Sequence, residues 1–344
     1  MDGNIRKWFC RNKTISCETG RFFTYCVGPE GNNNTPDVND QCERTQLQNA
    51  VLKALLYYDI WRYPLSEGEL YTFLPVDSLS YDEFRQALKS QGPGRDVAEE
   101  NGYYFLRERG TTVVEERQHR ERHADGLWRM ARLSAHIIKR FPFVRAVFVS
   151  GDLSKNATGP GSDVDFFVIT SPRRLWIARS LLILFKKIFL FNSRKYFCLN
   201  YFATEDHLAL DEKNVFLATE IAHLKPLFNT RMFYRYLEQN AWISAFFPNF
   251  DISRLSMPKA NDRRSFLQPI LEAAFRLLPA DRLDDYLLKK MRKIWIKRYA
   301  QYDEATHRRI FRSTRYESRA YVGNFQDKIL DLYRKKLQQY GVVE

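Results

Sequence analysis

The pattern of hydrophobic and polar positions is clearest in the middle of the chain, where two apolar runs flank a polar loop. The apolar run Ala146–Val149 predicts a buried strand that stops at Ser150-Gly151. A polar turn, a short helical piece and a Gly-Pro-Gly loop follow, and residues 164–170 predict a second strand. Side chains two positions apart in a strand point to the same side, so Asp163 and Asp165 should present two carboxylates on one face. The pattern therefore predicts a strand–turn–strand unit with paired carboxylates at one end.

The region 44–110 has the periodicity of a small helical module closed by a hairpin. Helical spacing of apolar residues predicts a first helix that ends near Tyr58, and Ser66 and Ser80 are typical N-caps of two further helices. The dipeptide Asn101-Gly102 predicts a tight turn between two strands. This order of elements resembles a winged helix-turn-helix.

Two interpretations of this module follow from its third predicted helix, YDEFRQALKSQ. One is DNA binding through that helix, as in helix-turn-helix proteins. The other is a scaffold or a protein-contact module. The helix offers only Arg85, Gln86 and Lys89 as contacts, against Asp82 and Glu83, and so thin a basic face favours the scaffold.

The remaining pattern predicts an α+β chain: a small mixed β-sheet core flanked by helices, with the winged-helix-like module before it and a helical C-terminal region after it. A third core strand is predicted at Tyr196–Ala203, and helices at 173–191, 212–228 and 232–246. The predicted organisation is a flexible leader at 1–43, the winged-helix-like module at 44–110, a connecting helix at 111–141, the core at 142–250 and the helical region at 251–344.

Composition and charge narrow the classes of function. The chain has 344 residues, of which 44% are hydrophobic, so global disorder is excluded. A net charge of +13 suits a polyanionic partner such as a nucleotide or nucleic acid. Four of the five cysteines lie in the first 42 residues without a C-x-x-C pair, which disfavours a zinc module. The most apolar run, Leu181–Phe191, contains two lysines and is too short to span a bilayer, so we expect a cytoplasmic protein without a membrane partner.

The paired carboxylates indicate the chemistry. Two carboxylates this close repel each other unless a cation lies between them or one of them is protonated. An oxygen-ligated divalent ion, Mg²⁺ or Mn²⁺, is the natural partner of Asp163 and Asp165. Gly151, just upstream, would let a phosphate approach the backbone. This combination points to nucleotide-phosphate chemistry.

A family resemblance rests on these same residues. The order strand, G-S-x-x-R-G, spacer, S-D-x-D, strand is typical of the nucleotidyltransferase superfamily, which includes DNA polymerase beta and the minimal nucleotidyltransferases. The chain has Gly-Asp-Leu-Ser-Lys-Asn at 151–156 and Ser-Asp-Val-Asp at 162–165. It resembles bacterial nucleotidyltransferase-domain proteins that carry an N-terminal winged-helix region and a helical tail. The stretches FCLNYF and ATEIAHLKPLFN extend the likeness over about 140–250.

The resemblance implies an activity and a set of site residues. The activity is metal-dependent transfer of NMP from an NTP to an acceptor that the sequence does not identify, with Mg²⁺ or Mn²⁺ as cofactor. Asp163 and Asp165 would be the catalytic metal ligands. The nucleotide-binding residues would be Gly151, Asp152, Ser154, Lys155 and Ser162.

The chain also departs from the family pattern. Asp152 stands where the family has a phosphate-binding serine, and Asn156 replaces a glycine, a mild change because asparagine tolerates positive φ. Asn200 occupies the strand expected to bring a third carboxylate. The acidic residues that could compensate are Glu205, Asp206 and Glu220, although the apolar helix around Glu220 also fits a structural partner such as an arginine. The departures keep a second hypothesis open, in which a catalytically degenerate nucleotidyltransferase fold acts as a nucleic-acid-binding regulator or an antitoxin-like partner of another protein.

Overall fold

The computed structural model divides the chain into two units, residues 1–47 and 48–344. Most of the predicted leader, residues 1–43, lies outside the described residues. Within the first unit, β1 (Lys13–Ile15) and β2 (Phe23–Tyr25) form an antiparallel pair. The described residues are 13–15, 23–25 and 45–343, apart from 77–78, 194, 255–256, 264, 276 and 320–323.

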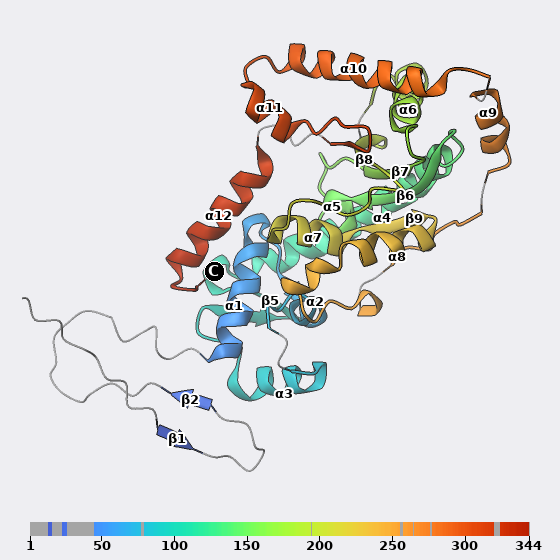
Figure 1. The fold of residues 1–344 in the computed structure, drawn as a ribbon. Helices are drawn as coiled ribbons and strands as arrows, with labels where there is room; N and C mark the ends of the chain where they lie inside the picture. The colour runs from blue at the N-terminus through green and yellow to red at the C-terminus, as the bar shows by residue number, and fades with distance from the viewer. Residues whose placement is uncertain are drawn as a thin grey trace, which may run out of the picture. The chain divides into compact units, whose positions relative to one another are not determined.

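The second unit is an α+β structure with a three-stranded and a five-stranded sheet, so the predicted α+β class is confirmed (Figure 1). The three-stranded sheet is antiparallel, with the order β3-β5-β4. It belongs to the N-terminal module, whose elements are α1 (Gln46–Tyr58), β3 (Leu65–Ser66), α2 (Glu67–Thr72), α3 (Tyr81–Gln91), β4 (Val97–Glu100) and β5 (Tyr103–Leu106).

The local signals in this module act as the sequence predicts. Ser66 and Ser80 each close a capping box, in which the serine hydroxyl accepts from the backbone N–H three residues on and a glutamate carboxylate returns to the serine backbone. Asn101 and Gly102 both have positive φ, 53° and 79°. That conformation is what a two-residue hairpin turn requires.

The long predicted connecting helix is α4 (Thr112–Ile138), and it leads into the five-stranded sheet. The sheet has the order β10-β8-β7-β6-β9, with β7 and β8 parallel and the other neighbours antiparallel. It is therefore mixed, as predicted. Its strands are β6 (Val144–Ser150), β7 (Asp165–Thr170), β8 (Cys198–Thr204), β9 (Lys225–Phe228) and β10 (Glu317–Ser318).

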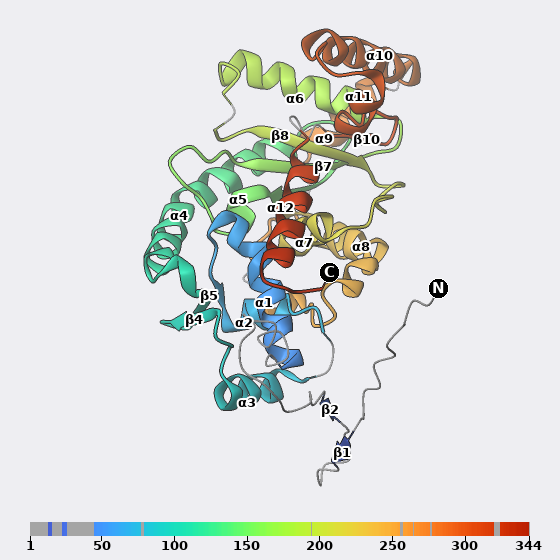
Figure 2. The ribbon, with the colours of Figure 1, turned by 90° about the vertical axis from the view of Figure 1, so that its left-hand side faces the viewer.

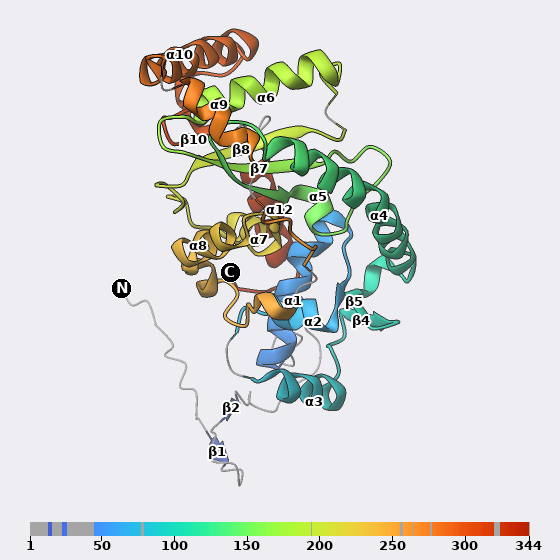
Figure 3. The ribbon, with the colours of Figure 1, turned by 90° about the vertical axis from the view of Figure 1, so that its right-hand side faces the viewer.

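Helices cover both faces of this sheet. On one face α4 and α6 (Leu175–Phe189) enclose a core that includes Val147, Val149 and Phe166. On the other face Phe148 meets Phe233 of α8 (Thr230–Gln239), with ring centroids 5.4 Å apart. Figures 2 and 3 show α4 and α8 on opposite sides of β6 and β7. The alternation of β6 side chains between two buried faces explains its nearly continuous apolar sequence.

The predicted helix at 212–228 is wrong in its second half. The helix α7 covers only Val215–His223, and the next residues form β9, which pairs antiparallel with β6. Pro226 lacks the backbone N–H that a continuing helix would use, and an edge strand accommodates it. The predicted helix at 232–246 is α8 followed by a 3₁₀ turn at Ala241–Ala245.

The C-terminal region is mostly helical, as predicted, but it also completes the sheet. β10 pairs with β8 at the edge of the sheet, which the helical pattern did not predict. The last helix returns to the N-terminal module, where Tyr333 donates a hydrogen bond to the Lys53 carbonyl at 3.2 Å (Figure 1). Within the described part of the chain, no helix is both long enough and apolar enough to cross a membrane. The helices are α9 (Leu267–Phe275), α10 (Ala280–Arg298), α11 (Glu304–Ile310) and α12 (Phe325–Gln339).

A buried carboxylate joins α10 to the start of α6. Asp284 is 2% exposed and accepts a hydrogen bond from the backbone N–H of Ile177 at 2.9 Å. Burial raises the pKa of Asp284 from 3.8 to about 6, although the backbone hydrogen bonds oppose this shift. The side chain therefore favours the folded state when it is protonated, and its contribution is lost as the pH rises through the folded pKa.

We expect Asp284→Asn to remove this pH-dependent contribution. Relative to the wild type, the variant should gain stability as the pH rises from 3.8 to about 6. The gain should be on the order of 2 kcal/mol, since one pKa unit corresponds to about 1.4 kcal/mol. Denaturant titrations of both proteins at several pH values in this range measure it. A difference in unfolding free energy between the two proteins that does not change with pH would contradict the raised pKa of Asp284.

Candidate functional site

The predicted strand–turn–strand unit brings the glycine turn and the second aspartate together. β6 ends at Ser150, Gly151 opens the single-turn helix α5 (Gly151–Ser154), and β7 begins at Asp165. Ser150 lies directly opposite Asp165 in the antiparallel register. On the other side of β7, Asp165 lies opposite Cys198 at the start of β8. The second aspartate is thus between the glycine turn and the start of β8.

Gly151 is required by the close approach of Asp165. Its φ is +68°, and an added Cβ would lie 2.5 Å from the Asp165 Oδ2 atom. Real Cβ contacts are not that short, and a positive φ is costly for a residue with a side chain. The sequence predicted that the glycine would leave room for a phosphate; in this structure, the neighbour in that room is the carboxylate of Asp165.

Replacing Gly151 with alanine is therefore expected to displace the Asp165 side chain and to destabilise the fold. The positive φ alone should cost about 1 to 2 kcal/mol. Gly159→Ala is a matched control, because an added Cβ at Gly159 has nothing within 4 Å. Its effect should stay within about 0.5 kcal/mol. Urea titrations of the two variants measure the difference, and equal stabilities would show that Gly151 is not constrained.

Asp163 and Asp165 lie on one side of the chain, as the strand alternation predicts. Val164 between them is fully buried, whereas both aspartates are partly exposed. The ladder with the next segment already begins at Val164, which accepts from the backbone N–H of Cys198 at 3.1 Å. The two carboxylates therefore share one face although β7 itself begins at Asp165.

Asp165 lies in a strongly negative surrounding. Burial, together with the charges of Asp163, Asp152 and Glu220, raises its pKa from 3.8 to about 6, although a hydrogen bond from the Cys198 thiol opposes the rise. The same contact and burial raise the pKa of the Cys198 thiol well above its ordinary value, so it is a protonated donor and not a nucleophile. The carboxylates that act on Asp165 come from α5, the β7 entrance and α7.

The residues present fit a divalent cation of the Mg²⁺ type. Within the described ranges, no set of three or more His, Cys, Asp or Glu side chains is gathered as a complete metal site. Mg²⁺ does not need one, because it is commonly held by one or two carboxylates together with water and substrate phosphates. Asp163 and Asp165 supply two carboxylates on one face, and the mutual repulsion at Asp165 is what a cation would relieve.

Two of the predicted nucleotide-binding side chains are used inside the loop. Asp152 is exposed, and its Oδ2 accepts a hydrogen bond from the Ser162 hydroxyl at 3.0 Å. The Ser162 hydroxyl in turn accepts from the backbone N–H of Gly159 at 3.0 Å. These contacts hold the two ends of the loop together. Asp152 therefore helps to close the loop through its hydrogen bond with Ser162.

Ser154 and Lys155 are also engaged within the protein. Ser154 is 3% exposed, and its hydroxyl donates to the Gly151 carbonyl at 2.7 Å, so it turns into α5 and not toward solvent. Lys155 forms a 2.6 Å ion pair with Glu220 of α7. Its carbonyl accepts from the Tyr63 hydroxyl at 2.7 Å, which links the loop to the N-terminal module. The structural partner expected for Glu220 is therefore this lysine.

The candidates for a third carboxylate differ in their position relative to Asp165. Glu205 donates its backbone N–H to Thr170, at the far end of β7 from Asp165, and Asp206 follows it. Glu220 is the acidic residue whose charge acts on Asp165. Asn200 is the extra residue of a bulge, because Phe166 pairs with Leu199 and Phe167 pairs with Tyr201.

The bulge explains a residue that the sequence interpretation missed. The sequence interpretation assumed a strand without a bulge and therefore placed Asn200 beside the aspartates. In the observed register, Cys198 is the residue opposite Asp165. Cys198 is half-buried and its thiol faces the carboxylate. Asn156 adopts a φ of 53°, the positive φ that an asparagine was expected to tolerate in place of the glycine.

Comparison of the chain with protein-family models, with curated proteins and with solved structures finds no match in any of the three.

Proposed function

We propose that the protein is a metal-dependent nucleotidyltransferase that moves NMP from an NTP to an acceptor. The observation that carries this proposal is the packing of the Asp165 carboxylate against Gly151, which joins the glycine turn to the paired aspartates in one site. Each half of the motif occurs by chance in many proteins. Their contact through a matched strand register is a much more specific arrangement, and it supports membership of the nucleotidyltransferase superfamily.

In this proposal, Asp163 and Asp165 hold Mg²⁺ or Mn²⁺ together with the triphosphate. A bound divalent ion neutralises phosphate charge and favours in-line displacement. The acceptor oxygen forms a bond to the α-phosphorus as the bond from that phosphorus to the bridging oxygen breaks. Pyrophosphate leaves with the electron pair, and the acceptor proton passes to solvent.

The other chain residues shape the loop around this site. Asp152 and Ser162 fix the loop between α5 and β7, and Gly151 leaves room for the Asp165 side chain. Lys155 is expected to act on a phosphate only if it leaves Glu220, since the ion pair at 2.6 Å uses its charge. The loop residues therefore position the two aspartates more than they contact the nucleotide.

The N-terminal module fits a winged-helix scaffold within this proposal. Its order of helices and strands and the β3-β5-β4 sheet support the winged helix-turn-helix assignment. Arg85, the main basic residue of its third helix, is paired with Glu67 at 2.8 Å. That pairing leaves little free positive charge for reading DNA and favours a contact role.

One observation supports the second hypothesis, a catalytically degenerate domain. Cys198 stands opposite Asp165 where a third carboxylate would complete the site. Such a protein would bind nucleic acid through its net charge of +13, or bind a protein partner in the manner of an antitoxin, without transferring NMP. Nucleic-acid retention that weakens with salt and survives loss of the aspartates would favour it.

The direct experiment is transfer from α-labelled NTPs in Mg²⁺. The purified protein is incubated with each of the four NTPs and with a cell extract as the source of acceptors, and labelled products and pyrophosphate are separated. Labelled product that depends on the divalent ion supports the proposal. The proposal would be rejected if the protein neither bound nor consumed any of the four NTPs.

A further inference from the structure

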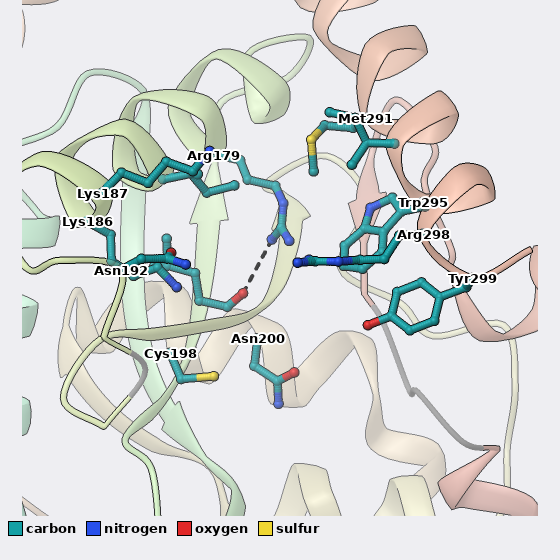
Figure 4. A pocket seen from close by; sticks show the side chains of 13 residues that line it. Arg179, Lys186, Lys187, Asn192, Cys198, Asn200, Met291, Trp295, Arg298 and Tyr299 are labelled. Carbon is teal, nitrogen blue, oxygen red and sulfur yellow. Dashed lines mark hydrogen bonds between the residues drawn. The ribbon is translucent and has the colours of Figure 1, made fainter.

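A basic cavity of about 500 Å³ lies between α6, β8 and α10, beside the paired aspartates (Figure 4). This volume is within the range of small-molecule sites. Thirteen residues line it; four of them are cationic and none is acidic. The cationic residues are Arg179, Lys186, Lys187 and Arg298.

The deepest cation, Arg179, has no carboxylate partner. Its side chain is 6% exposed, and its guanidinium lies over the Phe202 ring, 4.9 Å from the centroid. Among the described residues, its Nη1 donates to the Leu199 carbonyl at 3.4 Å, and its Nε has no hydrogen-bond partner. No acidic residue of the described part of the chain acts on its charge, and burial lowers the pKa of this guanidinium to about 10. In Figure 4 the guanidinium of Arg298 points toward that of Arg179. A buried cation facing another cation is costly unless an anion lies with them.

The opposite wall of the cavity is apolar and aromatic. Met291 and Ile294 of α10 line it, and Trp295 stacks on Tyr299 with ring centroids 5.8 Å apart. A simple inorganic anion would leave this wall without a contact. A ligand that fits both walls combines multiple negative charge, as on a phosphate, with an apolar or aromatic ring.

Strand β8 connects the cavity to the Asp163 and Asp165 motif. Cys198 and Asn200 line the cavity, and the Cys198 thiol donates to the Asp165 carboxylate. Asp165 therefore lies between Gly151 on the β6 side and the cavity on the β8 side. A transfer reaction needs two substrates on either side of its reacting centre, and these two sides are where they would lie.

We propose that this cavity binds a phosphorylated organic molecule that carries an aromatic ring, with its phosphate on Arg179 and Arg298 and its ring against the α10 wall. The assignment of this molecule as the acceptor rests on the proposed nucleotidyl transfer. The binding itself does not, since it needs neither the divalent ion nor the aspartates.

Isothermal titration calorimetry in EDTA tests the binding with four probes. AMP is expected to bind most tightly, glucose 6-phosphate more weakly, and adenosine and inorganic phosphate at least tenfold more weakly than AMP. This order distinguishes a nucleoside phosphate from other phosphorylated compounds; a glucose 6-phosphate affinity above that of AMP would assign the cavity to a non-aromatic ligand and overturn the ring contact.

Arg179→Met is expected to weaken AMP binding at least tenfold. Methionine removes a buried charge on which no described carboxylate acts, so the variant should fold; Arg298→Gln, at an exposed position, gives the same test if it does not. Lys293→Gln, an exposed lysine of α10 outside the cavity, is the charge-matched control and should change affinity less than twofold. AMP binding equal to wild type in both Arg179→Met and Arg298→Gln, or no AMP binding at millimolar concentration, would overturn the proposal. Binding that depends on Arg179 in a protein without transfer activity would retain this site and reject the proposed function.

Discussion

If the protein transfers NMP as proposed, replacing Asp163 or Asp165 with asparagine is expected to lower the rate by at least about a hundredfold, because each change removes one of the two proposed anionic metal ligands. Asparagine keeps the shape of the side chain, and at Asp165 it removes a charge that burial and three neighbouring carboxylates already disfavour. The Asp165→Asn protein should therefore be at least as stable as the wild type above pH 6. A loss of activity in this variant would therefore not be explained by a loss of folding.

Asp206→Asn is the matched control for these two changes. Asp206 is exposed and lies beyond the far end of β7, after Glu205, so its replacement should leave transfer within about twofold of the wild type. Rates of transfer from α-labelled NTP at saturating Mg²⁺, measured for all three variants, test whether Asp163 and Asp165 are specifically required. Equal rates in Asp163→Asn, Asp165→Asn and the wild type would show that the aspartates do not hold the catalytic metal.

A loss of about 3 to 5 kcal/mol in unfolding free energy is expected for Arg117→Met, since removing one partner of a buried ion pair leaves its counter-charge uncompensated. Arg117 is 6% exposed and binds the Glu69 carboxylate at 2.7 Å and Glu121 at 2.8 Å. Burial opposes ionisation of Glu69, but the Arg117 charge holds the pKa of that carboxyl below its ordinary value. The pair joins α2 of the N-terminal module to α4.

Arg62→Met provides the comparison for this prediction. Arg62 pairs with Glu116 of the same helix α4 at 2.8 Å, but both side chains are more than a third exposed. Exposed pairs contribute about 1 kcal/mol or less. Guanidinium titrations at neutral pH should therefore show a much larger loss for Arg117→Met, and equal losses in the two variants would contradict a buried structural network.

The features predicted correctly from the sequence are those set by local chemistry. The strand–turn–strand unit follows from a continuous apolar run that stops at Ser150-Gly151, and the helix starts at Ser66 and Ser80 follow from serines placed three residues before glutamates. The turn at Asn101-Gly102 needs positive φ, which these residues adopt readily. In each case the residues that cause the feature are adjacent in the chain.

The features that were missed depend on distant partners. The apolar sequence of β9 is compatible with a helix except at Pro226, and β10 is only two residues long. Neither strand therefore has a recognisable strand pattern in the sequence alone. The bulge at Asn200 shifts the register by one residue and puts Cys198 beside Asp165. The basic cavity also has no sequence signal, because its two walls come from α6 and α10, more than 100 residues apart.

The site and the cavity account together for the charges around β7 and β8. Negative side chains surround Asp165 on the β6 side, and four cations line the cavity on the β8 side, where none of the lining residues is acidic. A metal ion with a triphosphate would neutralise the first group, and a phosphorylated acceptor would neutralise the second. In this proposal, each ligand would bring charge of the opposite sign to the group of side chains that faces it.

The most direct test of the central claim is a crystal structure of the protein with Mn²⁺ and a non-hydrolysable NTP, measured at a wavelength where manganese scatters anomalously. The account predicts an anomalous peak bound by the carboxylates of both Asp163 and Asp165, with the triphosphate at the same ion. An NTP and Mn²⁺ bound elsewhere in the molecule, with these two carboxylates uncoordinated, would contradict it.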